Sequence, residues 1–549
     1  MQKISPQETN TLGTLVTKGR YAEAATLAQT MTVRCPQDAF GWKALGVVFK
    51  QTGRSADALA PMQEAAALEP GDAEVHFNLG SILGDLGRLD EAEASIRRAL
   101  QIKPDFFEAH CLLGLALSYL GRLDDAAASY RRALHINPNY AEAHHGLGAV
   151  LKELGQPNEA VASYRRALRI NPNYAEAHVN LSVALYGLGQ LEEAAASARR
   201  ALQIKPGHAE AHINLANALK ELGRIDEALS HFRKALDISP SLPAARYGIY
   251  FILNRLVPQW HVPMMNEPRR NNAYFAALKS AITPDSDVFE IGTGSGLLAM
   301  MAAKLGANRV TTCEAVPLIA KTAQRIVTDN GYEKSVKVIC KQSADVNVGE
   351  DLPQKADILV SEIFSSELLG EHVLPSIEDA KRRLLKPQGR VIPAAGSIMI
   401  AVFGGYDLGR NLKVEDSFGF KLQHFNSIVS EKQQIRRDDL DVEMLSDDTE
   451  AFRFDFENST SFPGQKKMLR IPIKNSGRCH GIIQWIRLQM DKEVVFENHP
   501  SEKSSVSNWQ RCAYVFPESI DVKPGQVIVV SASHNRKVPW FVFAGIESG

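Results

Sequence analysis

The sequence predicts an all-helical repeat solenoid, followed by a doubly wound α/β domain and then by a domain of β-strands. Three observations support this order. Glycines and prolines recur every 34 residues through the first 245 positions, and a glycine-rich turn follows an apolar stretch at residues 288–291. Strand-like alternation of apolar and polar residues dominates after residue 393. At 549 residues the chain is too long for one core, and we expect two to four domains.

The overall composition gives no electrostatic signal for a particular partner. The formal net charge is −1, so charge alone predicts neither nucleic-acid binding nor binding to an anionic membrane. Six cysteines are scattered without a Cys-x-x-Cys pair, which favours neither a disulfide framework nor a cysteine zinc site. The first residues lack the apolar core of a signal sequence, and no long apolar span follows. We therefore expect a cytoplasmic protein.

The N-terminal regularity has the period of a known helical repeat. Seven glycines from Gly19 to Gly223, and seven prolines from Pro36 to Pro240, recur at intervals of 34 residues, as in tetratricopeptide repeats. The glycine permits a tight turn between two helices, and the proline ends the second helix. Because only a neighbour can cover the apolar face of each helix pair, about seven units over residues 1–245 should stack into a superhelix with a concave groove.

Polar residues also recur in the first predicted helix of each unit. One position carries a histidine in five units but Trp42 in an earlier one, which favours packing over metal ligation: His76, His110, His144, His178 and His212. Two residues further on, Asn78, Asn180 and Asn214 recur, whereas Leu112 and Gly146 interrupt the series. The surrounding motif resembles the repeats of O-linked N-acetylglucosamine transferase, whose asparagines hold a polypeptide main chain. The resemblance implies recruitment of a protein substrate; partly exposed asparagines without a ligand are the alternative.

The second part begins with a nucleoside-binding pattern. An apolar strand leads into Gly292, Gly294 and Gly296, then a helix, a second strand and Glu314. Such glycines let the backbone approach a ligand closely, and the acid can hold ribose hydroxyls. The spacing Gly-Thr-Gly-Ser-Gly differs from the dinucleotide pattern. A compact turn with no diphosphate to hold favours S-adenosylmethionine over NAD.

Two glutamates flank a short loop after a later predicted strand. Glu362 follows the apolar run 358–360, and Glu371 comes nine residues later. Carboxylates at the carboxyl ends of parallel strands lie where open α/β sheets bind ligands. Because a guanidinium is always protonated and its planar fork matches carboxylates, the two glutamates can hold one and polarise it. Two solvated glutamates near a helix start are the alternative interpretation.

From His261 onward the sequence resembles the protein arginine methyltransferase family, and its repeats make it most similar to the member with N-terminal tetratricopeptide repeats. The stretch SEIFSSELLGE resembles the family's double-glutamate loop, which implies that Glu362 and Glu371 clamp the substrate arginine. Glu367 is an additional acid found in part of the family. The segment HVPMMNEPRRNNAY resembles the helix that folds over the cofactor. This implies that Arg270 pairs with the methionine carboxylate and that His261 lines the pocket.

The resemblance implies further roles. Glu290, Gly292, Gly294 and Gly296 match the first methyltransferase motif, Glu314 the ribose-binding acid, and Ser343 falls near the adenine contacts. The expected Rossmann-like domain spans residues 246–392. Residues 393–549 would form the family's β-barrel, in which the stretch 408–425 resembles a dimerisation arm and implies a homodimer.

Two departures from the family pattern argue against asymmetric dimethylation. Ser507, Asn508 and Trp509 stand where Thr-His-Trp is usual, and Asn254 interrupts the paired-tyrosine motif. The predicted activity is transfer of a methyl group from S-adenosylmethionine to an arginine nitrogen of a protein, with no metal and no nucleic-acid partner. A methyltransferase acting on another substrate and a non-catalytic repeat scaffold are the alternatives.

Overall fold

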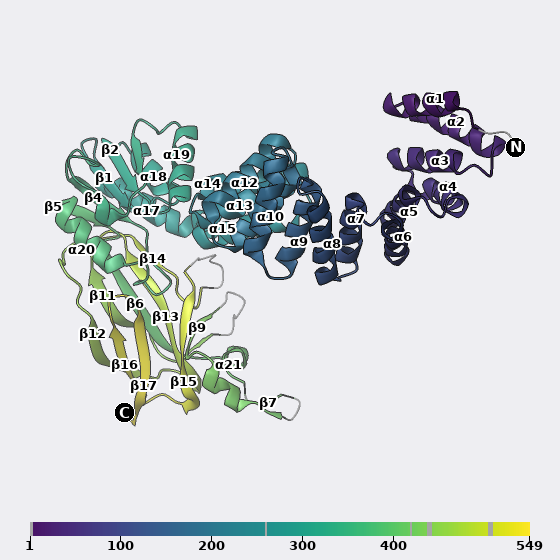
Figure 1. The fold of residues 1–549 in the computed structure, drawn as a ribbon. Helices are drawn as coiled ribbons and strands as arrows, with labels where there is room; N and C mark the ends of the chain where they lie inside the picture. Colours follow the sequence, from purple (N-terminus) through teal and green to yellow (C-terminus); the bar gives the residue numbers. More distant parts are fainter. Residues whose placement is uncertain are drawn as a thin grey trace. The chain divides into compact units, whose positions relative to one another are not determined.

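The computed structural model describes residues 4–258, 261–414, 416–417, 420–435, 442–502 and 509–548. It divides into two compact units, Met1–Ile252 and Leu253–Gly549, and each is described by itself. Figure 1 traces the elements of both units along the sequence, from purple to yellow. In the part of the chain that is described, no helix combines the length and apolar character needed to cross a bilayer.

Within residues 4–258, the first unit consists of seven helix pairs followed by one more helix. Each second helix contacts the first helix of the next pair, so the pairs stack in sequence order. The predicted helix-pair repeat is therefore confirmed. The helices are α1 (Pro6–Thr17), α2 (Tyr21–Arg34), α3 (Ala39–Gln51), α4 (Ser55–Leu68), α5 (Ala73–Asp85), α6 (Leu89–Ile102), α7 (Phe107–Tyr119), α8 (Leu123–Ile136), α9 (Ala141–Glu153), α10 (Pro157–Ile170), α11 (Ala175–Gly187), α12 (Leu191–Ile204), α13 (Ala209–Glu221), α14 (Ile225–Ile238) and α15 (Pro243–Leu256).

The turn within each pair needs glycine for its backbone conformation. From Gly19 to Gly223 the seven turn glycines have φ between 70° and 75°, a left-handed conformation that costs other residues about 1–2 kcal/mol. A Cβ added at Gly155 would meet no atom within 4 Å. The 34-residue glycine period therefore records a requirement on backbone dihedrals and not on space.

The recurring histidines connect five first helices, α5, α7, α9, α11 and α13, to the turn before each of them. Their Nε2 atoms lie 3.0–3.2 Å from the carbonyl oxygens of Pro70, Pro104, Pro138, Pro172 and Pro206. Trp42 Nε1 donates to the Pro36 carbonyl at 3.0 Å in the same way. Because the Trp42 indole nitrogen can only donate, we assign an N–H donor to this position throughout. The contacts agree with the structural role predicted for these residues.

The second unit begins with a parallel sheet whose strand order reverses at its centre. The order is β3-β2-β1-β4-β5, so the chain runs outward from β1 in one direction and then returns to the other side of β1 with β4. Ile291 at the end of β1 lies opposite Ser361 at the end of β4, and such a reversal forms a ligand-binding crevice. The predicted Rossmann-like sheet is confirmed. Its elements are α16 (His261–Met265), α17 (Pro268–Ala281), β1 (Asp287–Ile291), α18 (Leu297–Lys304), β2 (Arg309–Cys313), α19 (Pro317–Asp329), β3 (Val336–Ile339), η1 (Ser343–Asp345), β4 (Ala356–Ser361), α20 (Val373–Arg383) and β5 (Leu385–Ile392).

The rest of the unit contains the predicted β-strands, and in the residues that the structure describes these strands pair antiparallel. A seven-stranded sheet has the order β10-β6-β13-β15-β9, with β11 beside β6 and β14 beside β13, and a separate sheet has the order β12-β16-β17. Closure of these sheets into a barrel stays a prediction. The elements are β6 (Ala395–Gly404), α21 (Tyr406–Leu412), β7 (Asp416–Ser417), β8 (Phe420–Lys421), η2 (Gln423–Ile428), β9 (Lys432–Ile435), β10 (Glu443–Met444), β11 (Thr449–Asp455), β12 (Gln465–Pro472), β13 (Gly477–Gln489), β14 (Val495–Glu497), β15 (Arg511–Val522), β16 (Gln526–His534) and β17 (Pro539–Ser548).

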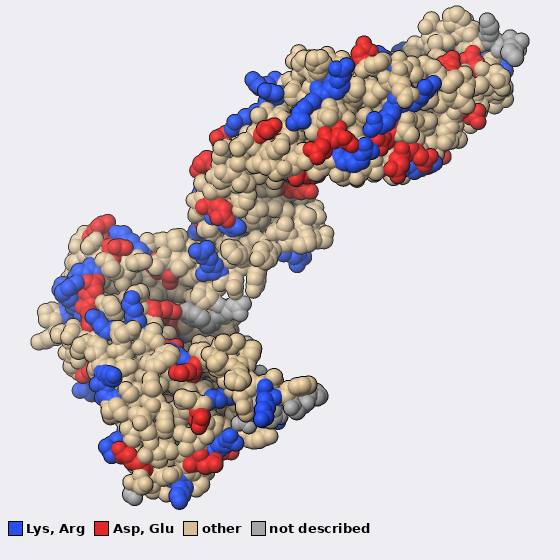
Figure 2. All heavy atoms as spheres, turned by 60° about the horizontal axis from the view of Figure 1, so that its bottom comes forward, with Lys and Arg blue, Asp and Glu red and all other residues tan. Residues whose placement is uncertain are grey.

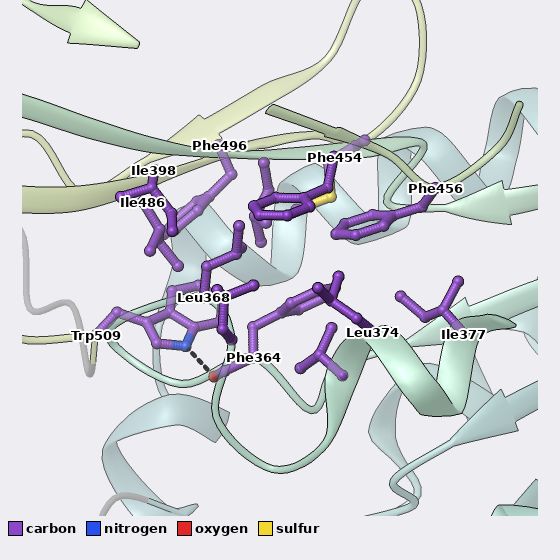
Figure 3. Packing of buried hydrophobic residues seen from close by; sticks show 14 of the residues in the cluster. Phe364, Leu368, Leu374, Ile377, Ile398, Phe454, Phe456, Ile486, Phe496 and Trp509 are labelled. Atoms are coloured by element: carbon purple, nitrogen blue, oxygen red, sulfur yellow. Dashed lines mark hydrogen bonds between the residues drawn. The ribbon is translucent and has the colours of Figure 1, made fainter. Parts of the chain in front are cut away.

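One hydrophobic core joins the parallel and antiparallel parts of this unit. Phe364 and Leu368, from the loop after β4, pack among side chains of the antiparallel part such as Phe454 and Phe496 (Figure 3). The indole N–H of Trp509 donates to the Phe364 carbonyl at 2.6 Å. Burial of each such large apolar side chain contributes about 1.5–3 kcal/mol, so the antiparallel part stabilises the loop after β4.

Charges of both signs are mixed on the surface seen in Figure 2. Lys and Arg side chains alternate with Asp and Glu on that face of each unit, in keeping with the net charge of −1. Any preference of the protein for a charged ligand therefore depends on local groups and not on its overall charge.

Candidate functional site

The carboxyl ends of β1, β2 and β4 bring three of the sequence motifs together. Gly292, Gly294 and Gly296 have φ values of 86°, 51° and 81°, all left-handed. The Gly294 N–H donates to Glu314 Oε2 at 3.3 Å, and the Val316 N–H donates to the other carboxylate oxygen at 3.0 Å. The glycine turn and the acid after β2 therefore form one hydrogen-bonded edge of the crevice.

The three glycines differ in the space that surrounds them. A Cβ at Gly292 would lie 2.8 Å from Ile363 Cγ2, and one at Gly296 would lie 3.2 Å from Val327 Cγ2. A Cβ at Gly294 would meet nothing within 4 Å. The outer two glycines thus allow close packing, whereas Gly294 borders open space where a ligand can approach the backbone.

A buried ion pair lies next to this turn, where α17 meets the end of β4. Arg270 Nη2 lies 3.1 Å from Glu362 Oε2, and the two side chains are 3% and 6% exposed. The Arg270 guanidinium carbon also lies 5.1 Å from the centroid of the Tyr274 ring. Tyr274 donates its hydroxyl to the Ser361 carbonyl at 2.9 Å, which fixes α17 against β4. Arg270 Nε has no hydrogen-bond partner among the described residues.

Two of the carboxyl groups are poised near neutral pH. Burial raises the pKa of Glu362 to about 7, even though Arg270 opposes this shift, and the charge of Glu371 adds to it. Burial raises the pKa of Glu290 to about 8, although a hydrogen bond from Thr312 and the charge of Arg270 act in the other direction. Glu290 is 1% exposed. Acids perturbed in this way are concentrated at functional sites.

Glu371 is held by an unusual backbone. It has φ of 56°, the next residue His372 has φ of 58°, and Leu368 has φ of 71°. Left-handed conformations of non-glycine residues cost on the order of 1–3 kcal/mol each and persist only where the surroundings enforce them. Desolvation by neighbouring atoms and the charge of Glu314 raise the pKa of Glu371, while its side chain stays accessible to solvent. The charge of Glu371 also adds to the raised pKa of Glu362, so the two loop carboxylates interact electrostatically.

His261 and Ser343 have other contacts in the structure. His261 opens α16, and its Nδ1 lies 3.1 Å from the Pro258 carbonyl. Ser343 opens η1, and its carbonyl accepts a hydrogen bond from Arg383 at 3.0 Å. The cofactor contacts expected of both residues stay predictions. Ser507 and Asn508 lie outside the described residues.

The contacts of two residues near the site, Tyr274 and Lys432, were not predicted from the sequence. Tyr274 lies one helical turn after Arg270, a spacing that places the two on one face of α17 and could have indicated the contact. Lys432 of β9 forms an ion pair with Glu367. These residues are 65 positions apart, and no local pattern connects them.

The asparagine series of unit 1 lies on helices that contact one another. First helices of successive pairs contact one another, from α3 with α5 through to α11 with α13. We infer from these contacts that the first helices line the inner surface of the stack. Asn78, Asn180 and Asn214 are half-buried there. Asn180 Nδ2 lies 2.8 Å from His145 Nε2, and Tyr174 contacts the other ring nitrogen at 3.3 Å.

The raised pKa values of Glu362 and Glu290 predict that unit 2 loses stability as pH rises. An unfolded glutamate has a pKa of about 4.3, whereas Glu362 and Glu290 stay protonated up to about 7 and about 8 in the fold. Between pH 5 and 8 the folded state therefore binds more protons, so the free energy of unfolding falls as pH rises and levels off above about 8. Glu290→Gln should flatten this slope and raise the stability at pH 8, measured by urea unfolding with tryptophan fluorescence.

The matched control is Glu333→Gln, because the Glu333 side chain is exposed. It should leave the slope unchanged. A wild-type slope in Glu290→Gln would contradict the assignment of the proton to Glu290.

Comparison with known families agrees with these two units. A family described as "Arginine methyltransferase oligomerization subdomain" matches residues 396–541, and "Ribosomal protein L11 methyltransferase (PrmA)" matches residues 273–398. Tetratricopeptide repeat families match residues 43–105, 114–155, 150–189 and 185–247. The repeat prediction is thereby confirmed a second time.

Solved structures and curated relatives each match about half of this chain. "Trypanosoma brucei PRMT1 enzyme-prozyme heterotetrameric complex with AdoHcy" is 18% identical with a TM-score of 0.44, and covers 52% of this chain and 93% of its own. An Arabidopsis thaliana protein arginine methyltransferase 10 structure is 21% identical with a TM-score of 0.42, and covers 49% of this chain and 86% of its own. "Protein arginine N-methyltransferase 7" of Oryza sativa subsp. indica is 32% identical over 313 residues, 50% of this chain and 43% of that protein.

"Protein arginine N-methyltransferase 1.6" of Arabidopsis thaliana is 30% identical over 304 residues, 50% of this chain and 42% of the relative. The chain thus spans less than half the length of these plant relatives. "Arginine N(omega)-methyltransferase" of Streptomyces achromogenes subsp. streptozoticus is 32% identical over 280 residues, which are 51% of this chain and 77% of that enzyme. With this identity over 77% of the relative's length, the chain belongs to the arginine methyltransferase family.

Proposed function

We propose that this protein transfers a methyl group from S-adenosylmethionine to a terminal guanidino nitrogen of an arginine in a polypeptide. The observation that carries the proposal is the position of two carboxylates at the two ends of one short loop, Glu362 directly after β4 and Glu371 shortly before α20, with the charge of Glu371 acting on Glu362. A planar, permanently charged guanidinium is the substrate group that such a pair fits. Free arginine is the rival substrate, because the name of the Streptomyces relative, arginine N(omega)-methyltransferase, does not mention a protein.

The residues of the crevice fit the cofactor. Open space beside Gly294 allows a ligand to reach the backbone, and Glu314 is positioned at the same edge to accept ribose hydroxyls. Arg270, with a buried Nε lacking a partner among the described residues, is suited to a carboxylate. His261, Glu290 and Ser343 complete the proposed set. When bound, S-adenosylmethionine supplies an electrophilic methyl group, and no metal is needed.

The chain's own residues then account for catalysis. Glu362 and Glu371 orient the guanidinium and draw its positive charge toward one side, so that one terminal nitrogen becomes richer in electron density. The reacting nitrogen loses a proton as the new bond forms. Glu371 is the better acceptor, directly or through a water molecule, because its side chain is accessible to solvent, whereas Glu362 is paired with Arg270.

Substitution of the loop glutamates tests the proposal. Glu371→Gln keeps the shape of the side chain and removes its charge, so turnover on an arginine peptide should fall on the order of 100-fold or more. Glu362→Gln should behave similarly, and the double variant should lose far less than the product of the single losses. Mass spectrometry should detect methylation of the arginine peptide but not of a lysine-substituted peptide.

Two controls sharpen this result. Glu367→Gln should lose less activity than Glu371→Gln, because the charge it removes faces Lys432. Wild-type turnover in Glu371→Gln would refute the clamp, and turnover on free arginine without turnover on peptides would favour the small-molecule function.

Gly294 tests the cofactor site separately from the chemistry. Gly294→Val should abolish binding of S-adenosylmethionine in calorimetry with a chelator present, because the added carbons would fill the space beside the backbone. Gly306→Val is matched, since Gly306 is also left-handed, with φ of 92°, and also has nothing within 4 Å. Gly306→Val also places a side chain on a left-handed backbone, but at the amino end of β2, away from the carboxyl ends of the strands, and should bind normally. Equal loss in both variants would mean that strain alone is responsible.

We further propose that the protein is a homodimer formed through the segment 408–425 and the residues next to it. Figure 1 shows α21 and β7 at one edge of the antiparallel part, and this segment exposes Tyr406, Phe420, Phe425 and Ile428 by 61–76%. Ile428→Asp should shift the mass in light scattering from dimer toward monomer. Met468→Asp, on an exposed apolar residue of β12, should leave the mass unchanged. A monomeric wild type with full activity would refute the dimer.

The repeat groove is proposed to recruit the polypeptide through Asn78, Asn180 and Asn214. Changing all three to alanine should raise KM for a long arginine-containing polypeptide and leave KM for a short peptide around the same arginine unchanged. The control is Asn158→Ala, because Asn158 is exposed on the second helix of its pair. Equal KM values for the long substrate in wild type and triple variant would argue for asparagines without a ligand.

A further inference from the structure

The acid between the two clamp glutamates is held by a cation from the antiparallel part. Glu367 forms an ion pair with Lys432 of β9, and the two side chains are 21% and 15% exposed. The Lys432 Nζ lies 5.4 Å from the ring centroid of Tyr514 and 5.7 Å from that of Trp540. An ammonium group in contact with two aromatic rings and one carboxylate has little freedom to move.

The aromatic partner of Lys432 is fixed in turn. Tyr514 donates its hydroxyl to Gln484 Oε1 at 3.0 Å and also lies 3.0 Å from the Pro539 carbonyl. The amide of Gln484 donates to the Ser366 carbonyl at 3.4 Å. Lys432 therefore belongs to a network of the antiparallel part that contacts residues 366 and 367 of the loop.

The ion pair is placed where the loop enters its strained part. Leu368, directly after Glu367, is the first of the left-handed non-glycine residues, and Glu371 is the next. Ser365 contributes a local turn, since its hydroxyl accepts from the amides of Glu367 and Gly370 at 3.2 Å and 2.9 Å. Strain of this kind has to be maintained from outside the segment.

We propose that Lys432 is a positioning residue, which holds Glu371 in place by anchoring Glu367. This inference rests on the proposed function. Lys432 acts through Glu367 and touches neither substrate nor cofactor, so Glu362 and Glu371 remain the carboxylates proposed to face the guanidinium. Loss of the Lys432 charge would leave Glu367 as a half-buried carboxylate without its counterion, which would move toward water and displace the loop.

The test combines kinetics with hydrogen exchange on the full chain. Lys432→Met should lower kcat on an arginine peptide on the order of 10-fold to 100-fold, the effect of a small displacement of reacting groups. The affinity for S-adenosylmethionine should stay at the wild-type value, and Lys432→Arg should keep most of the activity. The amides of residues 367–370 should exchange faster in Lys432→Met, and this readout does not depend on methyl transfer.

Lys467→Met is the matched control. Lys467 also stands over an aromatic ring of the antiparallel part, 5.1 Å from the centroid of Phe452, but is not paired with the loop. It should leave both kcat and exchange unchanged. Wild-type kcat and wild-type exchange in a folded Lys432→Met variant would overturn the proposal.

A charge-swapped pair covers the case in which Lys432→Met does not fold. Lys432→Glu and Glu367→Lys should each be slow, and their combination should recover most of the lost turnover and the slow exchange. A combination that folds but stays as slow as the single variants would refute the anchor. If wild type methylates no arginine substrate, the proposed function fails, while the exchange of the loop amides still decides whether Lys432 anchors it.

Discussion

The loop from Glu362 to Glu371 depends on the antiparallel part of unit 2 for its conformation. It contains left-handed residues without the freedom of glycine, and the free energy that they cost has to be offset by contacts outside the loop. Phe364 and Leu368 provide this by packing into the common core, and Trp509 holds the Phe364 carbonyl. The site on the parallel sheet is therefore stable only with the second half of the unit attached.

The electrostatics of the crevice follow from having more buried acids than cations. Arg270 is the described cation closest to Glu362, and its charge also acts on Glu290. Burial raises the pKa values of Glu362 and Glu290, neighbouring carboxylates add to the shift, and the charge of one guanidinium opposes it only in part. A second guanidinium, brought by a substrate, would relieve this imbalance, which is a physical reason for the site to prefer a permanently charged side chain.

The features that could be predicted from the sequence are those that depend on residues close together along the chain. The 34-residue period gave the helix pairs, since a turn glycine and a closing proline are local requirements. The glycine turn after β1 and the acids after β2 and β4 were assigned to one crevice because the carboxyl ends of parallel strands share an edge. The divisions at residues 245 and 392 stay predictions.

Long-range contacts could not be read in the same way. The ion pair of Glu367 with Lys432 and the hydrogen bond from Trp509 depend on the register of antiparallel strands far along the chain. The left-handed backbone of Glu371 could not be predicted from the local sequence, because nothing in the identity of a glutamate indicates a positive φ. Tyr274 is the exception, since its helical spacing from Arg270 was visible.

The hydrogen bond from the first helices α3 to α13 of successive pairs to a proline carbonyl limits how the solenoid can evolve. The donor can be an indole or an imidazole, as Trp42 and His76 illustrate. Different side chains can therefore occupy this position, provided that they place an N–H donor within reach of the proline carbonyl. The length of the connection is not free, because one inserted residue between Pro70 and His76 would carry the carbonyl out of reach. Repeats of this array can therefore be gained or lost as whole 34-residue units more readily than they can be lengthened.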